Sequence, residues 1–242
     1  SIFHQVFEQE IIPELKKNNI VVVCDQDKLS TEQCKYIRNV FYSNIITSIQ
    51  PLLMVKRKVR PFLKTGHPYM AMEMVSKDNT GANARDRYGI VKIPTDHNIS
   101  RFLELPGKDG NAYIMFLEDV IMRHINAIFP GYKVKNWYSL KLTRDADMEY
   151  DDYEGDDLID AIDRIRSARS VGLPNRFQYS RDMPEKLLEY LVATFHISKN
   201  ILVMGGSRHN FRDFFGFPNP LYPQLELEKL PPIPIPALSN LK

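Results

Sequence analysis

The sequence predicts an α+β fold, in which a mixed sheet with packed helices follows a partial helical bundle and precedes an extended proline-rich tail. Apolar residues recur every three or four positions through residues 3–15 and 34–49, which is typical of amphipathic helices. Short strand-like runs and further helical stretches alternate between residues 69 and 204 without regular βαβ spacing, which favours a mixed α+β domain. Seven of the 16 prolines lie between Pro218 and Pro236, and the densest stretch, residues 230–236 (LPPIPIP), has to be extended.

Hydrophobic content, net charge and cysteine count limit the classes of protein to which this chain can belong. The 242 residues are 43% hydrophobic, which is enough for a real core, and 32 basic against 30 acidic residues leave a formal net charge of only +2. Any anion binding therefore has to come from a local patch. Cys24 and Cys34 are too few for a disulfide framework and lack metal-pair spacing, so we expect a cytoplasmic protein, with peripheral membrane attachment left open.

We expect no transmembrane segment, because no apolar run approaches the roughly 20 residues that cross a bilayer. We also expect no secretory signal peptide, because the first residues do not show a basic stretch followed by an apolar one. It begins Ser1-Ile2-Phe3 inside an apparent helix, which suggests a piece of something longer.

The first 50 residues are expected to hold two helices. Asn19 ends the first helix, and a short apolar run follows at residues 20–24. Ser30 and Gln33 form a capping-box signal for the second helix, which Pro51 closes. One apolar face of that second helix carries Cys34, Ile37, Phe41, Ile45 and Ile49.

Residues 51–204 supply the strands of the expected domain. Residues 69–75 and 88–93 predict a hairpin with a long polar tip. Further strands are expected over residues 101–105 and 112–115, and a helix over residues 117–128. His124 lies on or beside the apolar face of this helix, where a lone histidine is more often a boundary residue than a base.

Residues 132–157 join an alternating strand to a dense acidic turn. The apolar side chains of the strand occupy even positions, namely Tyr132, Val134, Tyr138, Leu140 and Leu142. Trp137 is an exception on the polar face. A calcium loop starting at Asp145 would need glycine where Tyr150 stands, so we favour a structural interpretation: Asp156 and Asp157 begin the helix over residues 158–169, where the helix dipole favours anions.

The rest of the domain is expected to be a strand, a helix and a strand. Residues 176–180 form the first strand, and Asp182 with Glu185 predicts a capping box for a helix reaching Phe195. Residues 201–204 form the last strand. Gly205-Gly206 follows it, but this segment lacks the lysine and the spacing of a Walker loop.

The densest basic cluster is residues 56–60, Lys-Arg-Lys-Val-Arg. It is either a solvated connector or a polyanion site. Since stacking aromatics and nucleic-acid motifs are lacking, we expect no nucleic-acid partner. The alternative function for the chain is a non-enzymatic module that binds a polyanion or a protein through this cluster and the proline-rich tail.

The strand ending in Thr143-Arg144-Asp145-Ala146-Asp147, the acidic turn and the helix resemble the middle, or head, domain of the bacterial ATP-dependent polyphosphate kinases. Other segments are similar to that family in the same order along the chain. They are residues 10–15 (EIIPEL), 116–121 (FLEDVI), 129–132 (FPGY), 209–214 (HNFRDF) and 217–219 (FPN).

The resemblance implies a transferase that moves the terminal phosphate of ATP reversibly onto polyphosphate, with ATP and Mg²⁺ as cofactors and a homodimer as the assembly. In that family the phosphorylated histidine and the main nucleotide contacts belong to phospholipase-D-like domains beyond the C-terminal end of this chain. We therefore expect a fragment without catalytic or metal-binding residues, inactive alone, that provides scaffold, dimer contacts and part of a wall along the polyphosphate path. Its expected parts are the end of an N-terminal helical bundle (1–50), the middle domain (51–204) and a linker toward the catalytic domains (205–242).

Arg208, His209 and Arg212 are the candidates for anion contact, since they cluster near the junction with the expected catalytic half. The family's segment reads Gly-Arg-Tyr-His-Asn, whereas Ser207-Arg208 stands here in place of Arg-Tyr. His209 resembles the histidine that closes the head domain, not the phosphorylated one. The alternative, that these residues only anchor the linker, stays open.

Overall fold

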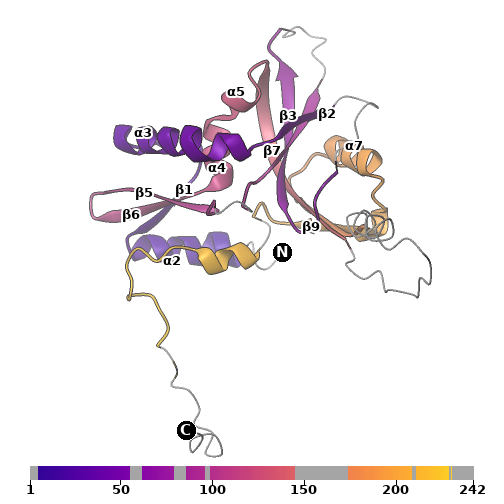
Figure 1. The fold of residues 1–242 in the computed structure, drawn as a ribbon. Coiled ribbons are helices and arrows are strands. Elements are labelled where there is room, and N and C mark those ends of the chain that lie inside the picture. Colours follow the sequence, from indigo (N-terminus) through magenta and orange to yellow (C-terminus); the bar gives the residue numbers. More distant parts are fainter. Residues whose placement is uncertain are drawn as a thin grey trace, which may run out of the picture.

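The computed structural model describes residues 5–54, 62–78, 86–95, 99–144, 174–208, 211–228 and 230. Two sheets lie side by side with helices around them (Figure 1). One sheet has three strands in the order β1-β6-β5, and the other has six in the order β2-β4-β3-β7-β8-β9. The predicted α+β class with a mixed sheet is confirmed. None of the helices in these ranges has the length and hydropathy needed to cross a membrane.

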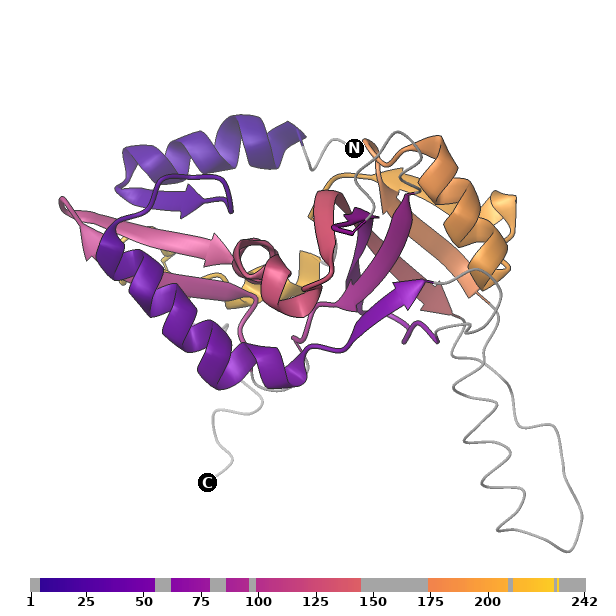
Figure 2. The same cartoon turned by 90° about the horizontal axis from the view of Figure 1, so that it is seen from above.

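The three-stranded sheet is covered by helices on both faces (Figure 2). Its strands are β1 (Ile20–Val23), β6 (Asn111–Phe116) and β5 (Phe102–Lys108), with β1 parallel and β5 antiparallel to β6. One face packs against α3 (Thr31–Val40) and its continuation, η2 (Phe41–Ile45) and η3 (Ile46–Ser48). The other packs against η1 (Phe7–Ile11), α2 (Ile12–Lys17) and η5 (Phe211–Gly216).

The six-stranded sheet is antiparallel except at one end, where β8 and β9 run parallel. Its strands are β2 (Pro51–Met54), β4 (Arg87–Lys92), β3 (Pro68–Ser76), β7 (Tyr132–Arg144), β8 (Pro174–Ser180) and β9 (Leu202–Gly205). The 3-10 turn η4 (Lys199–Ile201) leads into β9. The predicted hairpin of residues 69–75 and 88–93 is confirmed as β3 and β4. Helix α7 (Glu185–Phe195) covers one face, where Leu187 and Leu191 are buried.

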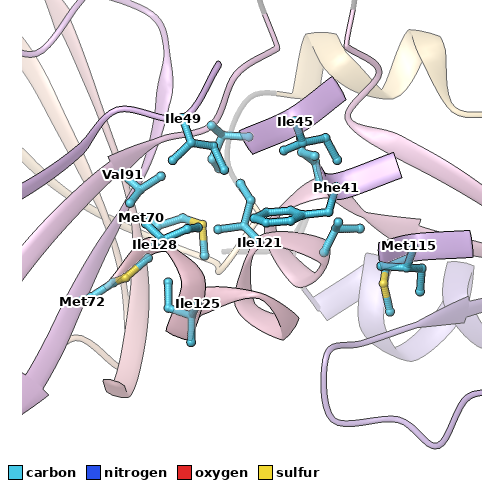
Figure 3. Packing of buried hydrophobic residues seen from close by; sticks show 14 of the residues in the cluster. Phe41, Ile45, Ile49, Met70, Met72, Val91, Met115, Ile121, Ile125 and Ile128 are labelled. Atoms are coloured by element: carbon cyan, nitrogen blue, oxygen red, sulfur yellow. The ribbon is translucent and has the colours of Figure 1, made fainter. Parts of the chain in front are cut away.

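A continuous apolar core joins the two sheets. Helices α4 (Leu117–Arg123) and α5 (Ile125–Ile128) bring Ile121 and Ile125 into contact with the methionines of β3, and η2 contributes Phe41. Figure 3 shows these side chains converging from helices and strands. Phe41 and Met70 are both 0% exposed. Burial of apolar surface on this scale is the main force that holds both sheets in one unit.

A bulge in β7 explains the position of Trp137. Glu73 pairs with Asn136, but Met74 pairs with Val134, so β7 has one extra residue, Lys135, opposite this step. Since neighbouring strand residues point to opposite faces, one extra residue exchanges the faces. Trp137 therefore joins Val134 against the inter-sheet core, while Tyr138, Leu140 and Leu142 face α7.

The predicted polar face of β7 is wrong after this bulge, because both faces are covered there. Ser139 is 0% exposed. Its backbone N–H donates to Ser180 Oγ at 2.7 Å, and Ser180 Oγ donates back to Ser139 O at 3.0 Å. These bonds satisfy buried polar groups that would otherwise cost free energy.

The predicted boundary at residue 50 crosses this packing rather than separating two units. Strand β1 pairs along its whole length with β6, more than 90 residues later in the sequence. Phe41, Ile45 and Ile49 share the inter-sheet core with residues of β3 and α4. The apolar faces of α2 and α3 are thus covered by the sheets.

Two local predictions need correction. Ser30 and Gln33 form the expected capping box, but Cys34 lies on the exposed side of α3. Asp182 does not cap α7, because the helix begins at Glu185 after Pro184 as its N-cap. A capping box needs its acceptor side chain at the N-cap itself, two residues later than Asp182.

The expected helix over residues 117–128 is present but interrupted at His124, between α4 and α5. The basic cluster of residues 56–60, the acidic stretch of residues 145–157, the helix expected over 158–169 and the prolines after residue 230 lie outside the described residues.

We predict that Phe41→Ala lowers the free energy of unfolding by about 3–5 kcal/mol, since it removes a fully buried ring between the two sheets. Tyr36→Ala is the control on the same helix, because Tyr36 is 38% exposed and should cost only about 0.5 kcal/mol. Urea unfolding of both variants measures the difference. Equal effects would show that residues 31–49 are not part of the common core.

Candidate functional site

Five charged side chains from four segments meet between the small sheet and η5. We call them the buried ion network: Arg101, Glu118, Asp119, Arg208 and Asp213. Arg101 precedes β5, Glu118 and Asp119 lie in the first turn of α4, Arg208 follows β9, and Asp213 lies in η5. Up to 112 residues of sequence separate the members that touch.

Local structure places the two acids. Strand β6 runs directly into α4, with Phe116 in an extended conformation as the N-cap. Glu118 and Asp119 therefore sit at the positive end of a helix, where carboxylates are favoured. The backbone N–H of Leu117 donates to Arg101 O at 2.8 Å, which fixes the arginine beside the same turn.

Arg101 holds two carboxylates at once. Its Nε donates to Glu118 Oε1 at 3.2 Å, its Nη2 donates to the same oxygen, and its Nη1 donates to Asp213 Oδ2 at 3.0 Å. The side chains of Arg101 and Glu118 are 1% and 0% exposed. A buried charge is tolerated only when it is paired and hydrogen-bonded, so each of these two groups needs the other.

Arg208 binds the second acid. Its Nη2 donates to Asp119 Oδ2 at 2.7 Å, and its Nη1 lies 3.7 Å from Glu118 Oε1. The guanidinium stacks on Phe116, with its Cζ 4.1 Å from the ring centroid. The bulge turns Trp137 to this side, and the centroid of its ring lies 5.8 Å from the Cζ of the same guanidinium. Planar stacking of this kind suits arginine and not lysine.

The pKa shifts follow from burial and pairing. Burial raises the pKa of Asp119 to about 6, Arg208 lowers it, and the neighbouring Glu118 raises it again. Burial also raises the pKa of Glu118, but Arg101 and Arg208 outweigh this and hold it below its ordinary value. The pKa of the adjacent Cys24 is raised to about 11 by burial and by Asp119, so this thiol stays protonated and unreactive.

This arrangement is suited to holding segments together and not to catalysis. Three carboxylates outnumber two guanidinium groups, so the network has no positive charge left for an external anion. Mg²⁺ prefers carboxylate oxygens in an octahedral shell. The carboxylates of Glu118 and Asp119 already accept from arginines, so the donor set does not fit a resident Mg²⁺ ion.

Of the three sequence-predicted anion contacts, the structure places Arg208 in the network. His209 lies outside the described residues. Arg212 belongs to η5, but its side chain is also outside them. The expectation that the three side chains lie together therefore stays a prediction.

Sequence reasoning did not single out Arg101, Glu118, Asp119 or Asp213 as site residues. A signal was present for two of them, because Glu118 and Asp119 interrupt the otherwise apolar residues 116–121. Charges inside an apolar run need buried partners. The partners could not be found from spacing, since they lie in distant parts of the chain.

Comparison with known proteins agrees with the earlier resemblance. Residues 32–217 match the family described as the polyphosphate kinase middle domain. The polyphosphate kinase of Vibrio vulnificus (strain YJ016) is 34% identical over 231 residues, covering 93% of this chain and 32% of that protein. The polyphosphate kinase of Escherichia coli (strain K12) is 33% identical over 217 residues, covering 87% of this chain and 30% of that protein.

A solved structure has the same fold. The crystal structure of polyphosphate kinase from Porphyromonas gingivalis superposes with a TM-score of 0.78 at 29% identity. The superposition covers 99% of this chain and 33% of that one. The chain therefore spans about a third of the length of the relatives it matches.

We predict a pH signature for Asp119. Its folded-state pKa of about 6 exceeds the ordinary 3.8, so the folded chain binds this proton more tightly. The stabilisation from Asp119 is complete below pH 4 and is lost as the pH rises to 6, with a slope of at most about 1.4 kcal/mol per pH unit. The free energy of unfolding of wild type minus that of Asp119→Asn should therefore fall between pH 4 and 7 in urea titrations. A difference that rises over this range would contradict the assignment.

We also predict strong coupling between Arg101 and Glu118. Arg101→Met leaves a carboxylate buried without its arginine and should cost about 3–5 kcal/mol, whereas Arg101→Met with Glu118→Leu should cost much less than the sum of the single changes. The exposed pair Lys17 and Glu14, at 2.8 Å, is the control. The same cycle there should give a coupling of about 0.2–1 kcal/mol. Additive costs for Arg101 and Glu118 would rule out a dependence of one on the other.

Proposed function

This chain belongs to the polyphosphate kinase family, whose middle domain it matches, and we propose that it is the scaffold part of an ATP:polyphosphate phosphotransferase. The complete enzyme would transfer the terminal phosphate of ATP to polyphosphate in a reversible reaction, with Mg²⁺ neutralising charge on the transferring phosphate. The match over residues 32–217 to a family named for this activity carries the proposal. The phosphate transfer itself is assigned to the two thirds of the relatives' length that this chain does not span.

The buried ion network supports a scaffold role. It binds residues that follow β9 to α4 and β5, and Phe214 and Phe217 pack on the rings of Phe102 and Phe116 at its side. Arg208 and residues 213–217, which are part of the expected linker (205–242), are thereby fastened to the small sheet. If the chain leaves this domain in a fixed direction, a catalytic domain that follows would be held at a constant position. Such positioning lowers the activation free energy of phosphate transfer, because the reacting groups are already oriented.

Two of the three candidate anion contacts, His209 and Arg212, remain part of the proposal. Arg208 is neutralised by Asp119 and Glu118, which supports the alternative that it anchors the segment. His209 and Arg212 stay the candidates for a contact with polyphosphate, because they adjoin this anchor in the sequence. Homodimer contacts and a wall along the polyphosphate path are further proposed roles.

We place the complete enzyme in the cytoplasm. Cys24 and Cys34 are both free thiols, which fits a reducing compartment.

The chain alone is expected to form no polyphosphate when incubated with radiolabelled ATP and Mg²⁺, since we assign it neither the nucleophile nor the nucleotide site. Gel electrophoresis of the products and acid-labile label on the protein are the measurements. A phosphohistidine on this chain would overturn the scaffold assignment. The complete protein encoded by the parent gene is the positive control and should form polyphosphate under the same conditions.

In that complete protein, Arg208→Met should lower kcat by about tenfold or more with little change of KM for ATP, because the anchor affects the position of the catalytic part and not ATP binding. Steady-state kinetics over a range of ATP concentrations separates the two parameters. An unchanged kcat would show that the anchor does not serve catalysis.

A further inference from the structure

Helix α3 and its continuation, η2, pass over α4 (Figure 1), and two arginines, a tyrosine and a histidine lie where these elements meet. They are Arg38, Tyr42, Arg123 and His124, which we call the α3–α4 corner. Arg38 and Tyr42 are exposed, while Arg123 and His124 are half-buried. The corner is therefore open to solvent and backed by the core.

His124 has a fixed orientation. Its ring stacks on Phe41, with centroids 4.2 Å apart and planes 11° from parallel, and Tyr42 contacts it edge-on at 5.9 Å. Its Nδ1 lies 2.9 Å from Val120 O. A carbonyl oxygen can only accept, so Nδ1 carries a proton, and in the neutral ring Nε2 is left with its lone pair.

The charges around this imidazole are cationic. The Cζ of Arg38 lies 5.9 Å from the Tyr42 ring centroid, and Arg123 is adjacent to His124 in the chain. Burial, then Arg123 and Arg38, lower the pKa of His124. Within the described ranges no carboxylate forms an ion pair with either arginine.

Arg123 has a donor to spare. One of its Nη atoms donates to the backbone oxygen of Asp27, which orients the side chain. Its Nε is buried and has no hydrogen-bond acceptor in the part of the chain that is described. A buried donor without an acceptor is unfavourable, so a small movement of this side chain toward an oxygen supplied from outside would remove a penalty as well as add a contact.

We propose that the α3–α4 corner is a binding site for a phosphate group, held by the guanidinium groups of Arg38 and Arg123 and by His124. Two guanidinium groups and an imidazole match the three terminal oxygens and the double negative charge of a phosphate better than the two oxygens of a carboxylate. The carbonyl groups at the C-terminal end of α4 carry a partial negative charge, which opposes an anion here. Because α4 has only seven residues, this partial charge is smaller than the formal positive charge of each arginine. The phosphate can come from inorganic phosphate, a polyphosphate chain or a nucleotide.

Protonation of His124 is linked to this site. A bound phosphate stabilises the imidazolium, so binding raises the pKa of His124, and affinity increases as the pH falls through that pKa. The charged groups that act on His124 from the elements around it are Arg38 of α3 and Arg123 of α4.

The test is an NMR titration of the histidine ring resonances of this chain, with His124 assigned from the signal missing in His124→Gln. In saturating tripolyphosphate the pKa of His124 should rise by about one unit, whereas sodium chloride of equal ionic strength should leave it nearly unchanged. Orthophosphate and ATP form the other two arms. If all three ligands shift His124, the site recognises a phosphate group. If only one does, that source is its ligand.

Arg38→Gln and Arg123→Gln should each weaken tripolyphosphate binding by about tenfold or more, the loss expected for one charge-assisted hydrogen bond. Arg181→Gln removes an exposed arginine near α7 and is the matched control, which should bind like wild type. Arg123→Gln loses the contact with Asp27, which could impair folding. Arg38 is exposed, so Arg38→Gln is expected to fold and keeps the proposal testable. A His124 pKa that does not respond to any of the three ligands, or full binding by Arg38→Gln, would overturn the proposal.

Discussion

The burial of the Glu118 carboxylate is the constraint on which much of this structure depends. A carboxylate with 0% exposure cannot stay ionised in an apolar interior unless cations and donors replace its water. Arg101 supplies three contacts and then reaches Asp213, while Arg208 closes the network from the other side. The first turn of α4 is thereby connected to the start of β5, the residues after β9 and η5.

This network explains why η5 packs on the small sheet, and aromatic rings join the N-terminal segment to the same place. The side chains of Phe7, Phe102, Phe116 and Phe214 form edge-to-face contacts with centroids 5.1–6.2 Å apart. These rings cover the ion pairs, exclude water and so strengthen them. In turn the ion pairs select one arrangement of η5, which apolar packing alone does less well.

The elements that sequence analysis predicted well are those with a local cause. The apolar runs of β3 and β4, the Ser30 capping box and the turn at Asn18-Asn19 each depend on neighbouring residues. The parallel pairing of β1 with β6 and the exchange of faces at Lys135 depend on residues far apart or on one inserted residue. Periodicity carries no information about either, which is why one polar face was expected along the whole of β7.

The candidate site shows the same division. Arg208 was a candidate because it lies near the junction with the expected catalytic half, but its acids, Asp119 and Glu118, lie some 90 residues earlier. Without these acids an arginine at this position suggests an anion contact, and with them it anchors the segment that follows β9.

The most direct measurement of the anchor is amide hydrogen exchange at Phe217, whose N–H donates to Phe214 O at 3.0 Å. We expect this amide to be protected in the wild-type chain and to exchange at least about tenfold faster in Arg208→Met while the amides of β3 keep their protection. Rapid exchange at Phe217 in the wild-type chain would contradict the anchor.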